Sequence, residues 1–177
     1  LAIAKNHAGK VLDLNGHDQW VEIYRQNNVE ISQDKLTLMC DVYPRKLISS
    51  CGSFITKGNY QFGLQQVGKD SLDFYIYTDQ AEPTKDNNRQ RNFMMFMRGK
   101  KEGIQRLRIK LPENWENNWH KLSGVYDGNA MTVYIDGKSV GSKEAKGSIT
   151  NFPFPINIGR NAEAHGQDTD CYICDAQ

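Results

Sequence analysis

Pairs of carboxylates are the first residues to test for chemistry. Hydrolysis of a glycoside needs one acid that donates a proton and a second that attacks or activates water, with the two about 5 to 9.5 Å apart. The closest pairs are Glu113 with Glu116, and Glu163 with Asp168 or Asp170. All lie in loop-like sequence that lacks the apolar alternation needed to hold them in place. We therefore interpret them as solvated loop acids, and the sequence predicts no catalytic residue.

The histidines and cysteines give no stronger signal. None of the four histidines is accompanied by a nucleophile-elbow sequence. Cys171 and Cys174 have the spacing of a metal or redox pair, but residues three apart on a strand point to opposite faces. A second pair of ligands with similar spacing is missing from the sequence. Neither a zinc site nor a thiol redox site is predicted.

Sugar recognition requires flat aromatic rings against the apolar side of a pyranose, together with amides or charged groups that hydrogen-bond its hydroxyls. Residues that alternate along two strand-like segments supply this mixture on one predicted face: Gln61, Gln65, Asp73, Tyr75 and Tyr77. We predict that these residues contact a ligand. A second interpretation stays open, in which Tyr75 and Tyr77 are cross-strand aromatic residues covered by residues 82–118 or by a neighbouring domain.

Three further candidate ligand residues, Arg89, Arg91 and Trp115, lie in loop-like sequence. Loops at the rim of a sandwich commonly carry binding residues. Trp115 closely follows Pro112, and a packed structural anchor is an equally good interpretation of it. A folded scaffold must hold all of these candidates in place, and the composition and the pattern of the sequence predict which fold it is.

Length and composition predict one globular domain, residues 1–177, with a substantial core. Lys and Arg total 22 against 21 Asp and Glu, so no global field would attract nucleic acid or an anionic membrane. The apolar runs are too short to span a bilayer, and no stretch reads as a signal peptide. Four cysteines are too few for a dense disulfide framework.

A period of two recurs along the whole chain and predicts an all-β fold. In residues 35–43, Leu36, Leu38, Cys40 and Val42 share one face, which we expect to point to the core. The Asp136-Gly137 dipeptide between two strand-like segments is the strongest hairpin signal. Such strands without βαβ alternation predict an antiparallel two-sheet jelly-roll sandwich.

One region fits this pattern less well. Residues 82–118 are rich in Lys and Arg and poor in acids, and we expect them to include an inserted excursion. Within it, Arg106, Arg108 and Lys110 alternate with apolar residues, which is typical of an edge strand whose charges discourage pairing with other chains.

The segments Asn118 to Gly128 (NWHKLSGVYDG), Met131 to Lys138 and Ile156 to Gly159 occur in an order that resembles the concanavalin A-like lectin/glucanase superfamily, in its laminin-G-like branch. The resemblance implies a concanavalin A-like sandwich over nearly the whole chain. Residues 171–177 are similar to the start of the family's last strand, which pairs beside the first, so we expect the chain to be part of a longer protein.

The resemblance also implies a possible metal. Many family members hold calcium where the opening hairpin meets the last strand, and the matching positions here are Asn15, Gly16, Asp18 and Asp175. Asn-Gly and His-Asp are also ordinary turn residues, and two carboxylates are a sparse ligand set for calcium. No cofactor is required by this interpretation, and a structural calcium is an option that it leaves open.

The approach from Leu111 to His120 resembles sandwich modules carried by large bacterial β-galactosidase-like enzymes. The leading hypothesis is therefore a non-catalytic carbohydrate-binding accessory module of a glycoside hydrolase. Its expected partners are a glycan or polysaccharide and other domains of the parent enzyme, in the periplasm or outside the cell. The alternatives are an architectural module that binds no sugar and, less favoured, an independent glycosidase.

Overall fold

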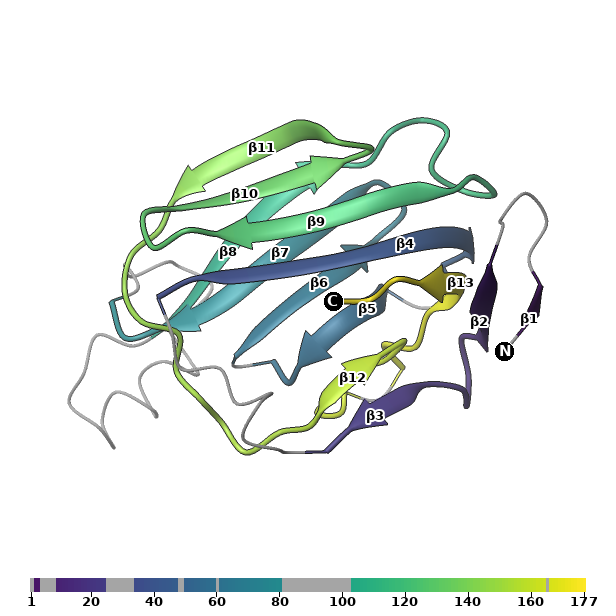
Figure 1. Ribbon diagram of the computed structural model, residues 1–177, viewed down its shortest axis with the longest axis horizontal. Helices are drawn as coiled ribbons and strands as arrows, with labels where there is room; N and C mark the ends of the chain where they lie inside the picture. The colour runs from purple at the N-terminus through teal and green to yellow at the C-terminus, as the bar shows by residue number, and fades with distance from the viewer. Residues whose placement is uncertain are drawn as a thin grey trace.

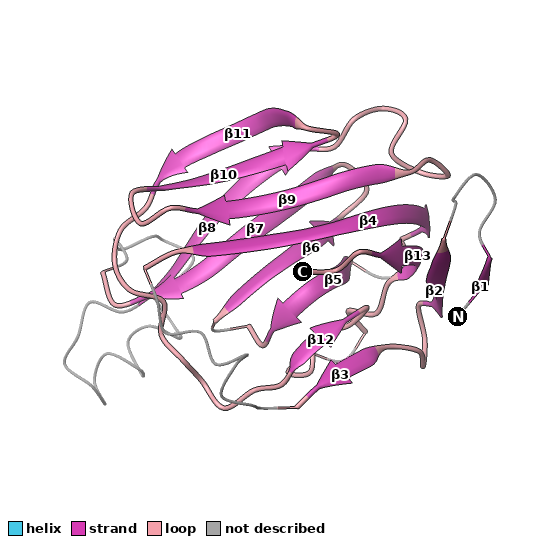
Figure 2. Ribbon diagram, viewed as in Figure 1, coloured by secondary structure: helices cyan, strands magenta, loops and turns pink. Residues whose placement is uncertain are grey.

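The computed structural model describes residues 2–3, 9–24, 34–47, 50–59, 61–80, 103–164 and 166–177. These residues form two antiparallel sheets that face each other, and the secondary-structure view shows strands and loops (Figures 1 and 2). The predicted all-β sandwich is therefore confirmed. No helix in the described ranges is long and apolar enough to cross a membrane.

The seven-stranded sheet has the order β1-β2-β13-β4-β9-β10-β11. Its strands are β1 (Ala2–Ile3), β2 (Lys10–Asn15), β4 (Leu36–Lys46), β9 (His120–Tyr126), β10 (Ala130–Ile135), β11 (Lys138–Glu144) and β13 (Asp170–Cys174). The six-stranded sheet has the order β3-β12-β5-β6-β7-β8. Its strands are β3 (Val21–Ile23), β5 (Cys51–Lys57), β6 (Phe62–Val67), β7 (Ser71–Thr78), β8 (Gly103–Lys110) and β12 (Ile156–Ile158).

The alternation of residue types along β4 sets the faces of the seven-stranded sheet. Leu36, Leu38, Cys40 and Val42 are all buried, as predicted. β4 lies between β13 and β9 and pairs with both in antiparallel register. Because successive side chains point to opposite faces, the residues between these four point away from the core.

The hairpin predicted at Asp136-Gly137 is present, and the two alternating segments that carry Gln65 and Tyr75 also pair as a hairpin. β6 and β7 pair from Phe62 opposite Ile76 to Val67 opposite Ser71. β10 and β11 are joined by Asp136 and Gly137, whose φ angles are both positive, at 53° and 76°. This backbone conformation matches the turn expected for an Asp-Gly dipeptide between antiparallel strands.

The core lies between the sheets, and one contact shows how closely they pack. Gly124 on β9 faces the ring of Phe74 on β7, which is fully buried. A Cβ built on Gly124 would lie 2.7 Å from Cδ2 of Phe74. Any larger residue at position 124 would therefore force the ring or the sheets to move.

The expected excursion at 82–118 is only partly open to test. Residues 103–110 form β8, which pairs with β7 over its whole length at the edge of the six-stranded sheet. Arg106, Arg108 and Lys110 are exposed on it, as an edge strand requires. Residues 103–110 thus form the expected edge strand of the sandwich, residues 81–102 lie outside the described residues, and the excursion itself stays a prediction.

We expect Gly124→Ala to lower the free energy of unfolding by about 1 to 3 kcal/mol, because an added methyl group overpacks the contact with Phe74. Urea denaturation followed by tryptophan fluorescence measures the change. Ser123→Ala, on the outward face of the same strand, is the matched control and should change stability by less than about 0.5 kcal/mol. Equal effects of the two substitutions would contradict the close approach.

Candidate functional site

The face predicted to contact sugar is brought together by the fold. Gln65 on β6 pairs with Asp73 on β7, and Gly63 pairs with Tyr75. These residues alternate with core residues such as Leu64 and Phe74, so they lie on the outer side of the six-stranded sheet. All five predicted side chains on this face are nevertheless buried, with exposed fractions of 7% or less.

Tyr75 cannot stack on a sugar, which corrects the prediction. Its ring lies over Gly63, where a Cβ would come within 2.5 Å of ring atoms. Its hydroxyl donates a hydrogen bond to the carbonyl oxygen of Gly58 at 2.7 Å. Burial raises the pKa of the Tyr75 phenol well above its ordinary value, so the hydroxyl stays protonated as a structural donor.

Asp73, Tyr77 and Gln61 are also engaged inside the protein. Arg108 donates two hydrogen bonds to the Asp73 carboxylate, at 2.7 and 2.8 Å. Tyr77 packs edge to face against Phe152, with ring centroids 5.4 Å apart. The amide of Gln61 accepts a hydrogen bond from the backbone N–H of Phe152. The polar groups of Asp73 and Gln61 thus have partners inside the protein, as buried polar groups usually do, and the Tyr77 ring is packed against another ring.

Gln65 differs from its neighbours on this face. Its Oε1 atom is buried without a hydrogen-bond partner, and so is Oγ of Ser53, which lies opposite it on β5. Both residues are buried, so these two atoms face the protein interior. The ligand role of Gln65 stays a prediction, whereas Arg89 and Arg91 lie outside the described residues.

Trp115 is a packed anchor, which was the alternative interpretation of it. Only 3% of its surface is exposed. Its indole stacks on the ring of His120 at a centroid distance of 4.9 Å, and its Nε1–H donates to Oε1 of Gln66 at 2.9 Å. His120 in turn contacts Asp136 through Nδ1 at 2.9 Å. The Trp-His pair therefore ties the loop after β8 to the β10–β11 hairpin.

The four residues predicted to bind calcium do not converge. Asp170, not Asp175, lies opposite Asn15 in the β2–β13 register. Asp175 follows the far end of β13, about 16 Å along the strand from Asp170 at roughly 3.3 Å per residue. Asp18 accepts a hydrogen bond from the Asn15 amide at 2.7 Å, and Gly16 has the positive φ of a turn residue. The register therefore separates Asp175 from the other three residues, and a structural calcium stays a prediction.

A guanidinium group already supplies positive charge beside this turn. Arg45, from β4, donates to Asp170 at 2.5 Å and to Asp13 at 2.6 Å, and also to the carbonyl oxygen of Leu14. The three acceptors belong to β2 and β13. Arg45 therefore fastens β4 to the adjacent strand β13 and, beyond it, to β2.

Sequence reasoning missed a row of aromatic rings on the outer face of the seven-stranded sheet. Tyr172 on β13 pairs with Tyr43 on β4, and the ring centroids are 5.8 Å apart. The Tyr43 ring lies 5.7 Å from that of Trp119, which precedes β9. All three residues are partly exposed. We call Tyr172, Tyr43 and Trp119 the aromatic row.

Charged groups flank the aromatic row. The guanidinium of Arg45 lies 4.6 Å from the centroid of the Tyr172 ring. Two residues before Tyr43 on β4, Asp41 lies on the same outer face. It is opposite Lys121 of β9, with which it forms an ion pair at 3.7 Å. Aromatic rings beside hydrogen-bonding groups are the combination that a pyranose requires. The alternation of Asp41 and Tyr43 with core residues was the signal that could have revealed this face.

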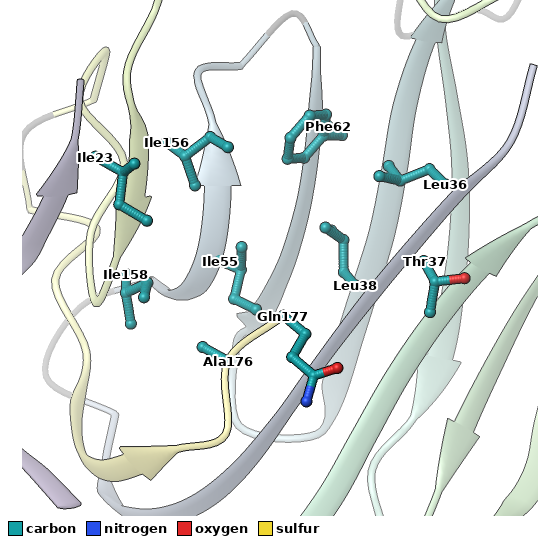
Figure 3. A pocket seen from close by; sticks show the side chains of 10 residues that line it. All are labelled: Ile23, Leu36, Thr37, Leu38, Ile55, Phe62, Ile156, Ile158, Ala176 and Gln177. Atoms are coloured by element: carbon teal, nitrogen blue, oxygen red, sulfur yellow. The ribbon is translucent and has the colours of Figure 1, made fainter. Parts of the chain in front are cut away.

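An apolar cavity of about 210 Å³ lies between the sheets, and its character differs from that of the aromatic row (Figure 3). Ile23, Ile156 and Ile158 line one side of it, and Leu36 and Leu38 line another. Thr37 and Gln177 are its polar lining residues. A sugar needs partners for its hydroxyl groups, so the lining suits an apolar group better than a sugar.

A family model described as the concanavalin A-like lectin/glucanases superfamily matches residues 15–177. The chain belongs to this superfamily. The match extends over most of the sandwich, from the end of β2 to the last described residue. A comparison of the chain with curated proteins finds no match.

Solved structures show the same fold at low sequence identity. The binding domain of Paraclostridial Mosquitocidal Protein 1 is 13% identical with a TM-score of 0.63, and the match covers 93% of this chain and 40% of that one. The botulinum neurotoxin serotype D/C binding domain is 13% identical with a TM-score of 0.56 and coverages of 90% and 38%. Domains LG4-5 of the mouse laminin alpha1 chain are 14% identical with a TM-score of 0.51 and coverages of 93% and 40%. The superfamily domain thus spans about two fifths of the chains it matches.

We expect Arg45→Met to lower the free energy of unfolding by about 1 to 3 kcal/mol, because it leaves Asp170 and Asp13 without their charged donor. Chemical denaturation measures the loss. Lys121→Met is the matched control, since Lys121 is largely exposed and its ion pair with Asp41 is long, so its cost should stay below about 0.5 kcal/mol. A loss at Arg45 as small as the control would contradict the fastening role.

The thiols provide a pH-dependent prediction. Burial, with the nearby Asp175 and Asp41 carboxylates, raises the pKa of Cys174 from 9.0 to about 11. At pH 8 its thiolate fraction should be roughly a hundredfold below that of an unperturbed thiol, so iodoacetamide labelling should be slow and accelerate as the pH rises towards 11. Peptide mapping by mass spectrometry measures this, with buried Cys40 and Cys171 as internal controls. Fast labelling of Cys174 at pH 8 would disprove it.

Proposed function

We propose that this domain is a non-catalytic carbohydrate-binding module, and that the aromatic row is its contact with the sugar. The observation that carries the proposal is the set of three adjacent, partly exposed rings on one sheet face. An aromatic ring offers the apolar face of a pyranose a large contact at little entropic cost. The neighbouring Arg45, Asp41 and Lys121 supply donors and acceptors for hydroxyl groups.

The row is rigid, which favours binding. Tyr172 and Tyr43 are held by the pairing of β13 with β4, and Arg45, which is bound to Asp13 and Asp170, lies against one side of the Tyr172 ring. A surface that is already ordered loses little side-chain entropy when a ligand binds. The rings are tilted by 58° and 47° relative to their neighbours. This arrangement suits successive sugars of a twisted chain better than a flat crystalline surface.

The proposal includes a parent protein. The stretch from Leu111 to His120 resembles modules of large β-galactosidase-like enzymes, and a module of this kind would keep an attached glycoside hydrolase near its glycan in the periplasm or outside the cell. Two of the similar structures are described as binding domains, which also supports a binding role. Glu163 was one of the carboxylates tested for catalysis in the sequence. Its carboxylate accepts a hydrogen bond from the backbone N–H of Asn59, which gives it a structural role.

A glycan array followed by calorimetry tests the proposal. We expect the domain to bind at least one neutral oligosaccharide, and we expect Trp119→Ala and Tyr43→Ala each to weaken that binding about tenfold or more, because each loses a stacking surface. Tyr134→Ala is the matched control. Tyr134 is a partly exposed tyrosine on β10, and it lies outside the three-ring cluster, so binding should stay within about twofold of the unmodified domain.

Two results would overturn the proposal. Silence across a broad array would favour an architectural module that packs on a neighbouring domain. Binding that is unaffected by Trp119→Ala and Tyr43→Ala would place any sugar site elsewhere. Circular dichroism and thermal unfolding of each variant establish that the fold is retained, since all three residues lie on the outer face of the sheet.

A further inference from the structure

A groove, separate from the apolar cavity described above, lies where the edges of the two sheets meet. β8 and β11 are the end strands of their sheets. A Cβ on Gly141 of β11 would lie 2.5 Å from Cγ2 of Ile109 on β8, so the two edges are in close contact. Next to this contact lies a groove of about 360 Å³, lined by Lys110, Leu111, Pro112, Ile135, Asp136, Lys138 and Val140.

The groove has apolar walls that reach solvent. Val140 is 43% exposed and is among the most exposed large hydrophobic residues of the described chain. Pro112, which is partly exposed, also lines the groove. The volume falls within the range of about 300 to 1,000 Å³ that is usual for small-molecule sites. These walls can take the apolar face of one sugar ring.

The charge in the groove is positive. Lys110 comes from the end of β8 and Lys138 from the start of β11, and both are exposed. Within the described part of the chain, neither ammonium group forms an ion pair. Asp136 is the acid in the lining, but one of its oxygens contacts Nδ1 of His120 and the other accepts the backbone N–H of Lys121, each at 2.9 Å. Its carboxylate is therefore held by the protein, while the two lysines remain available.

We propose that this groove binds an acidic sugar, one that carries a carboxylate or a sulfate. The anionic group lies between Lys110 and Lys138, and the pyranose ring lies against Val140 and Pro112. A neutral sugar would use the apolar walls but not the two positive charges, whereas a bare anion would leave the apolar walls unused. The inference extends the proposed function to a separate contact and rests on it only in taking the ligand to be a carbohydrate.

Calorimetric titration with trigalacturonate tests the proposal, with the fully methyl-esterified trisaccharide as the matched neutral ligand. We expect the acid form to bind at least about tenfold more tightly than the ester, and we expect sodium chloride at about 0.5 M to remove most of the difference, because exposed charges are screened. Titration with a sulfated trisaccharide shows whether the groove prefers a sulfate or a carboxylate on the sugar. Inorganic sulfate alone should bind much more weakly than either acidic sugar.

The variants assign the site. The double substitution Lys110→Gln and Lys138→Gln should weaken binding of trigalacturonate about tenfold and leave binding of the ester unchanged. Lys143→Gln, which removes an exposed lysine further along β11, should have no more than about a twofold effect. Val140→Ser should weaken the acid and the ester alike, because it removes an apolar wall and no charge.

The proposal is overturned if the acid and the ester bind equally, if neither binds, or if Lys143→Gln weakens binding as much as the double substitution. Equal affinity for sulfate and the sulfated sugar would also overturn it, because the ring would then contribute nothing. Trp119→Ala separates this inference from the proposed function. Loss of neutral glycan binding in that variant, with trigalacturonate binding retained, shows two independent contacts.

Discussion

The register of β4 against its two neighbours is the constraint on which the rest of the molecule depends. β4 pairs with β13 on one side and with β9 on the other. A slip of one residue would exchange the two faces of the strand, expose Val42 and bury Tyr43. The observed register places Leu36, Leu38, Cys40 and Val42 in the core, and it also places Tyr43 between Tyr172 and Trp119. Folding and the proposed recognition surface therefore follow from the same pairing, which Arg45 reinforces by bridging β4 to Asp13 and Asp170.

The two sheets use their aromatic residues in different ways. On the six-stranded sheet, Tyr75 covers Gly63 and Tyr77 packs on Phe152, so these rings are structural. On the seven-stranded sheet the outward rings retain partial exposure. Burial of a ring stabilises the fold but removes the surface that a sugar would contact. This division moves the proposed function from the face that is richest in aromatic and amide residues in the sequence to the opposite sheet.

Local patterns predicted the fold well because strands and turns are encoded locally. The alternation along β4, the β6–β7 hairpin and the Asp136-Gly137 turn all rest on a few neighbouring residues. The site was harder to predict, because exposure depends on what packs against a face. The sequence around Tyr75 does not show that Gly63 lies opposite it, and the aromatic row joins residues from positions 43, 119 and 172. The position of Asp175 relative to Asn15 was hard to predict for a related reason, since only the strand register reveals that Asp170 lies opposite Asn15.

The most direct test of the central claim is an NMR titration of the three tryptophan indole N–H signals with a neutral oligosaccharide that binds the domain. Trp119 belongs to the aromatic row, Trp115 is buried with its N–H bound to Gln66, and Trp20 is exposed near β3 on the other sheet with Arg160 over its ring. The account predicts a saturable shift of the Trp119 signal while the signals of Trp115 and Trp20 stay in place. A shift of Trp20 with an unchanged Trp119 signal would contradict it.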